Sequence, residues 1–275
     1  MGMRVAIVGA FGQTGPALIE HLPPEYDLTL VDVADHPDHE TVVADAADPE
    51  EIAPALADHD AVVLLARAPY DGADDVEGLC DNLRMIHATL AAARDHGLET
   101  VVFASTNHVV GTYEDAFAPD VYYPGHEVTI DHTVPVRPDS LYAVGKACGE
   151  ALGRFVVDHE RYPEQFFALR IGTVRPAEQD HPYCQAEAGV DRNDWERDSV
   201  EYRRQAARTK ATWQSRWDFA HLVESCVETS GAGFDVFYGV SDNDRRFWDV
   251  DHARETIGYD PRDNAEAWTE PPVKE

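Results

Sequence analysis

Lysine is nearly absent from this chain of 275 residues, which has three lysines against nineteen arginines. Basic residues number 22 and acidic residues 52, so the formal net charge is −30. A surface with that charge repels nucleic acid and anionic membranes, and we expect neither as a partner. The acidic residues are scattered along the chain, which indicates a strongly hydrated, salt-adapted surface; a dedicated acidic binding face is the alternative.

Cysteine and long apolar runs are also scarce. The four cysteines are widely separated and form no Cys-x-x-Cys pair, which argues against both a zinc site and a disulfide framework. We therefore predict no metal. No apolar run approaches the roughly 18 residues that cross a membrane, and the first residues run into a strand without a signal peptide. The expected location is the cytoplasm.

Short apolar runs alternate with helical patterns in the first half of the chain. Strands are expected over 5–8, 28–31, 42–43, 61–65 and 100–104, and helices over 16–22, 50–57 and 75–96. Continuous apolar strands that alternate with helices predict a parallel sheet covered on both faces, which is the doubly wound Rossmann fold of the α/β class.

The segment between the first strand and the first helix reads Gly9-x-x-Gly12-x-x-Gly15. Gly9 and Gly12 allow the backbone to turn tightly and approach a pyrophosphate, and Gly15 allows the helix to pack closely on the strand. Phe11 and Gln13 lie in the same loop. The pattern predicts a dinucleotide site, and a turn with only a structural role is the alternative.

An acidic residue, Asp32, ends the second strand roughly 20 residues beyond the glycines. A carboxylate there accepts hydrogen bonds from the adenosine ribose and repels a 2′-phosphate, which favours NAD over NADP; a solvated loop residue is the alternative. We expect Asp45 to reach the adenine. Ala66, after the fourth strand, and Asn82, in the next helix, complete the predicted cofactor contacts.

One of the three lysines, Lys146, follows Tyr142 by four residues, and residues with that spacing share a helix face. The lysine's charge can lower the pKa of the phenol, so that the phenol acts as a base near neutral pH. From the numbers of tyrosines and lysines, roughly 0.1 tyrosine–lysine pairs at this spacing are expected by chance in the whole chain. Polar residues follow the strand expected over 100–104, and among them Thr106 brings a hydroxyl to the carboxyl edge of the sheet, where it can orient a substrate oxygen.

The second half of the chain is less regular. Helices are expected over 138–159, 217–229 and 250–257 and strands over 166–171 and 235–238, with an irregular, lid-like insertion over 178–208. We predict an NAD-binding Rossmann domain over 1–160, which carries the catalytic Tyr/Lys helix. Residues 161–275 complete the sheet and form a small C-terminal substrate lobe.

Together these motifs resemble the extended short-chain dehydrogenases/reductases of the NAD-dependent epimerase/dehydratase family. The closer likeness is to uronate dehydrogenases and to sugar 1-dehydrogenases of salt-loving archaea, and it spans nearly the whole chain. The segments that carry it are Phe103–His108, Arg137–Tyr142, Leu169–Thr173, Ser241–Arg245 and Asp263–Ala267.

The resemblance implies that Tyr142 is the general base, that Lys146 assists it and holds the nicotinamide ribose, and that Thr106 is their hydroxyl partner. It also implies a set of substrate-binding residues, which are Asn107, His108, Thr173 and Arg208. Arg208 would bind an anion at C6 of the sugar, since a guanidinium suits a carboxylate or a phosphate. A packing histidine and a surface arginine are the alternatives for His108 and Arg208.

The chain departs from uronate dehydrogenases at two places. Pro69 stands where those enzymes have a substrate-contacting serine, and the 178–208 segment is longer than their matching loop. Both differences concern the distal part of the substrate. They leave the hydride chemistry intact and the identity of the sugar open.

The predicted function is NAD-dependent oxidation of a cyclic sugar, a uronate or an aldose, at C1 to its lactone. A sugar-6-phosphate 1-dehydrogenase is the main alternative. A nucleotide-sugar epimerase is disfavoured by the short C-terminal lobe, and a non-catalytic NAD-binding regulator would not need Tyr142 and Lys146. We expect a homodimer or a higher homo-oligomer that associates through the long helices.

Overall fold

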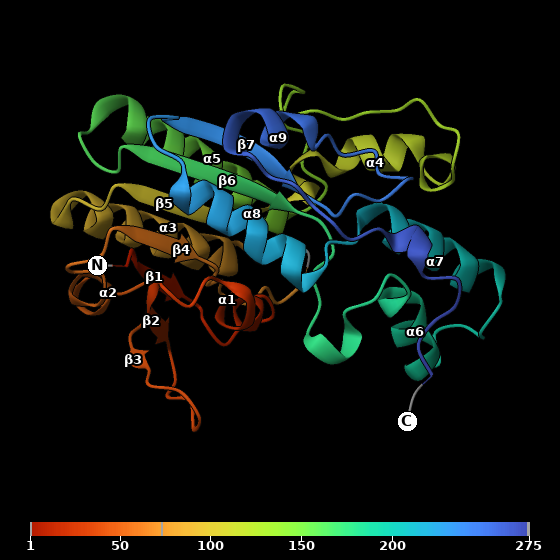
Figure 1. The fold of residues 1–275 in the computed structure, drawn as a ribbon, viewed down its shortest axis with the longest axis horizontal. Coiled ribbons are helices and arrows are strands. Elements are labelled where there is room, and N and C mark those ends of the chain that lie inside the picture. The colour runs from red at the N-terminus through yellow and green to blue at the C-terminus, as the bar shows by residue number, and fades with distance from the viewer. Residues whose placement is uncertain (1, 73, 274–275) are drawn as a thin grey trace.

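The computed structural model describes residues 2–72 and 74–273, which form a seven-stranded parallel sheet with helices on both faces (Figure 1). The strand order is β3-β2-β1-β4-β5-β6-β7. The strands are β1 (Arg4–Val8), β2 (Asp27–Asp32), β3 (Val42–Val43), β4 (Ala61–Leu64), β5 (Thr100–Thr106), β6 (Gln165–Ile171) and β7 (Phe234–Gly239). The order reverses between β1 and β4, where ligands bind in sheets of this kind. This confirms the predicted Rossmann fold.

A hydrophobic core lies on each face of the sheet, which explains why the strand sequences are continuous apolar runs. Val5 and Ile7 of β1 belong to the core beneath α1 (Gly15–His21), α8 (Arg216–Glu228) and α9 (Asp251–Ile257). Ala6 and Val8 belong to the opposite core, beneath α2 (Pro49–Ala55), α3 (Val76–His96) and α5 (Leu141–His159). Because side chains alternate along a strand, both faces must be apolar.

The insertion predicted to be irregular is largely helical, so that part of the prediction is wrong. Its helices are α6 (Cys184–Asp191) and α7 (Val200–Thr212). They bury a small cluster that includes Ala186, Tyr202 and Ala206, and Trp195 packs against this cluster. The charged exterior hides this pattern in the sequence. A short helix, α4 (Gly111–Phe117), was not predicted either.

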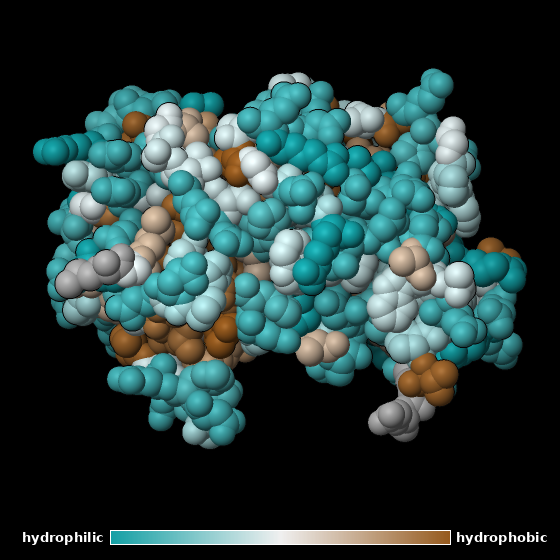
Figure 2. Space-filling view, viewed as in Figure 1, coloured by the Kyte–Doolittle hydropathy of each residue, from teal (hydrophilic) through white to brown (hydrophobic). Residues whose placement is uncertain are grey.

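Figure 2 shows a face dominated by hydrophilic residues, with its main hydrophobic area near the N-terminal strands. Within the described residues, no helix combines the length and the apolar character needed to span a membrane.

Helix α5 packs closely on the sheet because glycines face the strands. A Cβ on Gly149 would lie 2.6 Å from Cζ of Phe103 on β5. A Cβ on Gly153 would lie 2.4 Å from the ring of Phe166 on β6. Side chains larger than hydrogen would therefore push the helix away from the strands.

A buried ion pair fixes the same helix to the same strands. The carboxylate of Glu150 on α5 accepts hydrogen bonds from Nε and Nη2 of Arg170 on β6, at 3.0 and 2.9 Å. Ser105 on β5 donates its hydroxyl to Glu150 at 2.6 Å. The Arg170 and Glu150 side chains are only 3% and 6% exposed.

Replacing Glu150 with Gln should lower the free energy of unfolding by about 3 kcal/mol, because the buried Arg170 would lose its compensating charge. Urea unfolding in molar salt measures this change. Glu255→Gln, at an exposed position of α9, is the matched control and should change stability by less than about 0.5 kcal/mol. Equal effects of the two substitutions would show that the pair does not fix the helix.

Candidate active site

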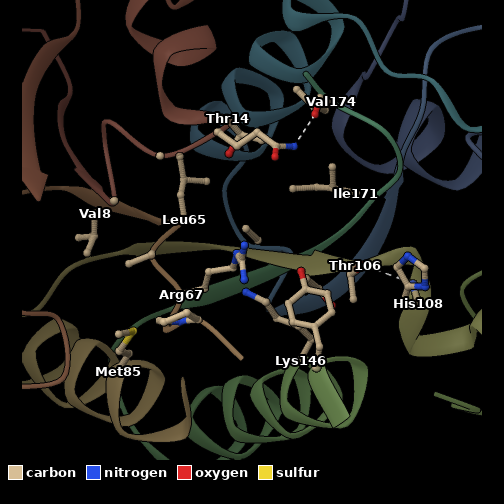
Figure 3. Close-up of a pocket in the computed structure, with 18 of the residues that line it drawn as sticks. Val8, Thr14, Leu65, Arg67, Met85, Thr106, His108, Lys146, Ile171 and Val174 are labelled. Atoms are coloured by element: carbon tan, nitrogen blue, oxygen red, sulfur yellow. Dashed lines mark hydrogen bonds between the residues drawn. The ribbon is translucent and has the colours of Figure 1, made fainter. Parts of the chain in front are cut away.

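A cavity of about 770 Å³ lies at the carboxyl ends of the central strands, among the residues that the structure describes. This volume lies within the usual range for small-molecule and cofactor sites. Most of the predicted site residues line it, namely Gly9, Phe11, Gly12, Gln13, Asp32, Ala66, Thr106, Asn107, His108, Tyr142, Lys146, Thr173 and Arg208. Residues from both halves of the chain therefore meet in one place (Figure 3).

Three predicted cofactor residues, Gly15, Asp45 and Asn82, lie outside the cavity lining. A Cβ on Gly15 would lie 2.2 Å from the carbonyl oxygen of Ala10, so this glycine permits close packing at the start of α1. Asp45 accepts a hydrogen bond from the backbone of Ala47 at 2.8 Å. Asn82 instead holds the loop after β4, where its amide bonds both the N–H and the carbonyl of Ala68, at 3.1 and 3.2 Å.

The glycine loop forms a cradle that fits a dinucleotide. Gly9 has a φ of +84°, and a Cβ there would lie 2.6 Å from the backbone nitrogen of Ala66, so a side chain would fill the cradle and strain the backbone. Asp32 fixes the loop by accepting a hydrogen bond from the N–H of Phe11 at 2.9 Å. The amide of Gln13 donates to the carbonyl oxygen of Val174 at 2.8 Å, which joins the loop to the chain after β6.

The predicted catalytic side chains extend from α5 toward the end of β5. Ser140 caps the helix by accepting a hydrogen bond from the backbone N–H of Ala143 at 3.3 Å, which places Tyr142 in the first turn. Lys146 is 4% exposed, and its Nζ lies 4.7 Å from the ring centroid of Phe103 and 5.9 Å from that of Tyr142. Figure 3 shows Lys146 and Arg67 extending into the same part of the cavity.

Burial dominates the electrostatics of the pair. It raises the pKa of Tyr142, although the charge of Arg67 and a hydrogen bond with Thr106 act in the opposite direction. Burial, reinforced by the charge of Arg67, lowers the pKa of Lys146 to about 7. The sequence suggested that Lys146 would lower the pKa of Tyr142. In the structure the pKa of Tyr142 is raised. The positive charge that acts against this rise comes from Arg67, which sequence reasoning missed.

Arg208 reaches the cavity from α7, but a buried glutamate already holds one side of it. Its Nε donates to Oε1 of Glu114 at 2.6 Å, and Glu114 is only 3% exposed. The hydroxyl of Tyr122 donates to the same carboxylate at 2.9 Å. Glu114 lies on α4, a helix that was not predicted, so no pattern in the sequence indicated this contact.

The charge of the lining contrasts with that of the chain. The cations in the described lining are Arg67, Lys146, Arg175 and Arg208, and the one carboxylate is Asp32, at the end of β2. Arg175 follows Val174 directly, and its side chain interacts with the thiol of Cys184. It was not singled out from the sequence, although its place just beyond β6 is the kind of position where ligands bind.

Known proteins share this architecture. The model of the NAD dependent epimerase/dehydratase family matches residues 5–174. An NAD-dependent glucose-6-phosphate dehydrogenase of Haloferax volcanii is 35% identical, over 98% of this chain and 97% of that protein. A uronate dehydrogenase of Pseudomonas syringae pv. tomato is 31% identical, over 96% of this chain and 84% of that protein.

The structural likeness covers the full chain. The crystal structure of a mutant uronate dehydrogenase from Agrobacterium tumefaciens, complexed with NAD, superposes with a TM-score of 0.73 and 29% identity. The alignment covers 100% of this chain and 92% of that one. The family model spans more than half of the chain and a relative above 30% identity spans almost all of it, so this protein belongs to the NAD-dependent epimerase/dehydratase family.

Proposed function

We propose that this protein is an NAD-dependent sugar 1-dehydrogenase that oxidises an anionic aldose at C1 to its lactone. The observation that carries the proposal is that Tyr142, Lys146 and Thr106 line one cavity, in which the charged lining residues of the described chain are mainly cations. The relatives named as glucose-6-phosphate and uronate dehydrogenases support the same reaction class. A third relative is an L-arabinose 1-dehydrogenase (NAD(P)(+)) of Haloferax volcanii, 30% identical over 95% of this chain and 97% of that protein.

The reaction requires removal of a proton from the anomeric hydroxyl as hydride leaves C1. Tyr142, as phenolate, takes that proton, and the Thr106 hydroxyl orients the reacting oxygen. Arg67 stabilises the phenolate by its charge. NAD, when bound, supplies the hydride acceptor. Asp32 favours NAD over NADP because a carboxylate at the ribose repels a 2′-phosphate.

A sugar 6-phosphate is the first candidate substrate, and a uronate is the second. Arg175 and Arg208 provide two guanidinium groups, which suit a phosphate dianion better than the single charge of a carboxylate. Pro69 also lines the cavity and offers no side-chain hydrogen bond where uronate dehydrogenases carry a serine. The glucose-6-phosphate dehydrogenase relative agrees with this choice. Cytoplasmic location and homo-oligomeric assembly remain predictions.

Tyr142→Phe should lower kcat by roughly 100- to 10,000-fold, because the base that removes the proton is lost. The KM for NAD should stay within about twofold, since the ring remains in place. The measurement is NADH formation with glucose 6-phosphate, glucuronate, galacturonate, arabinose and galactose in molar salt. Tyr123→Phe, at an exposed tyrosine outside the cavity lining, is the control. A full rate in Tyr142→Phe would refute the proposed mechanism.

Lys146→Met should stabilise the ligand-free fold at neutral pH. The folded-state pKa of about 7 lies below the ordinary value of 10.5, so the unfolded chain binds more protons between these two values. The lysine is therefore most destabilising below pH 7, and the effect fades as the pH rises toward 10.5.

Urea unfolding at a series of pH values measures the difference in free energy between Lys146→Met and the wild type. That difference should be a few kcal/mol near pH 7, at about 1.4 kcal/mol per unit of pKa shift, and should shrink with rising pH. Arg84→Met, at a cation with a side chain 63% exposed, should show no such trend. A constant difference for Lys146→Met would mean that burial does not shift its pKa.

Arg208 should contribute to binding of anionic sugars only. Its removal alone would leave Glu114 buried without its cation, so the comparison is between Glu114→Gln and the double variant Glu114→Gln/Arg208→Met. The double variant should have a KM for glucose 6-phosphate roughly 10-fold higher or more, which is the value of a charge-assisted hydrogen bond. The KM for arabinose should stay within about twofold. An equal rise for both sugars would remove the anion-binding role.

A further inference from the structure

A histidine and an aspartate form a pair at the cavity that Tyr142 also lines, and the proton transfer described so far does not use this pair. His108 lies in the 3-10 helix η1 (Asn107–Val110), directly after β5, and Asp139 precedes α5. Nδ1 of His108 lies 2.5 Å from Oδ2 of Asp139. The two side chains are 40% and 20% exposed, and His108 lines the cavity (Figure 3).

The position of the aspartate is fixed from several sides. Its other carboxylate oxygen accepts a hydrogen bond from the hydroxyl of Ser140 at 2.9 Å. A Cβ on Gly111 would lie 2.0 Å from Oδ2, so the carboxylate rests against a backbone that only glycine allows. The N–H of Arg137 donates to the carbonyl oxygen of Val109 at 3.0 Å, which joins the two segments.

This arrangement determines where the imidazole carries its proton. Burial alone raises the pKa of Asp139, but the hydrogen bond with His108, the charge that His108 carries when protonated and the hydrogen bond from Ser140 outweigh burial, and the net pKa is lowered. An ionised carboxylate only accepts hydrogen bonds, so the proton of neutral His108 must lie on Nδ1. Nε2 then presents a lone pair, and it has no hydrogen-bond partner within residues 2–72 and 74–273.

We propose that Asp139 is a positioning residue that fixes His108 as a hydrogen-bond acceptor, and that His108 thereby selects a ring hydroxyl of the sugar. The inference rests on the proposed sugar dehydrogenase function and deepens it. A hydroxyl donates to Nε2, whereas the oxygens of a phosphate or carboxylate are themselves acceptors and are repelled by it. Nε2 of His108 therefore binds a ring hydroxyl of the substrate, whereas Arg175 and Arg208 bind its anionic group. Together these contacts orient C1 toward Tyr142.

The first test reads the tautomer directly. Nitrogen-15 NMR of the ligand-free protein at mildly alkaline pH should show the proton of His108 on Nδ1. In Asp139→Ala the proton should shift to Nε2 or divide between the two nitrogens, and in Asp158→Ala, an exposed aspartate on α5, it should stay on Nδ1. A proton on Nε2 in the wild type overturns the proposal, whether or not the variants fold.

The second test reads specificity, with single-deoxy analogues of the sugar that the wild type oxidises. In the wild type, kcat/KM should fall roughly 10- to 100-fold for the analogue that lacks the hydroxyl bound by His108. In Asp139→Ala that penalty should shrink to less than about threefold, with the KM for NAD unchanged. An equal loss for every analogue in Asp139→Ala would indicate a structural role and overturn the proposal.

The two tests separate the failure of this inference from that of the proposed function. The tautomer is observed without any substrate, so it reports on Asp139 and His108 alone. Failure of the wild type to reduce NAD with every sugar would refute the dehydrogenase function. Turnover by a wild type that carries its His108 proton on Nε2 would refute only the role of Asp139.

Discussion

The close contact between helix α5 and strands β5 and β6 is the constraint on which the rest of the site depends. Two glycines let the helix approach the aromatic rings, and the buried Glu150–Arg170 pair holds it there. Tyr142, Lys146 and Glu150 are each separated by four residues, so they share one face of the helix. The ion pair that anchors Glu150 therefore also places Tyr142 and Lys146 against the end of β5. It also removes Lys146 from water, which is why its pKa falls.

The charge of the molecule is divided between two environments. The chain carries a net charge of −30, yet four cations and one carboxylate are the charged groups of the described cavity lining. Exposed charges are screened within a few ångströms in concentrated salt, whereas partly buried groups are screened much less. Arginine is the cation that suits such positions, because its fork can hold one acceptor while it offers another edge to a ligand. Arg208, held by Glu114, is placed in this way.

The sequence was informative where local spacing decides position. The glycine loop, Asp32, Thr106, Tyr142 and Lys146 follow strand ends or helix periodicity. All of them contribute to one cavity except Gly15, which packs against the backbone of Ala10. Tertiary contacts decided the rest. Segment 178–208 becomes helical because small residues pack around Tyr202 and Trp195, and Glu114 meets Arg208 from 94 residues away. The direction of the pKa shift of Tyr142 depends on its burial, which no spacing pattern reveals.

Lys146 also ties the stability of the protein to the occupancy of its site. The cost of a buried charge at Lys146 weakens the empty fold, and any ligand that binds only the folded chain offsets such a cost by mass action. The free energy of binding then contributes to the free energy of folding. Since the fraction of unfolded chains governs how fast a cell degrades a protein, we expect the lifetime of this molecule to follow the supply of its ligands.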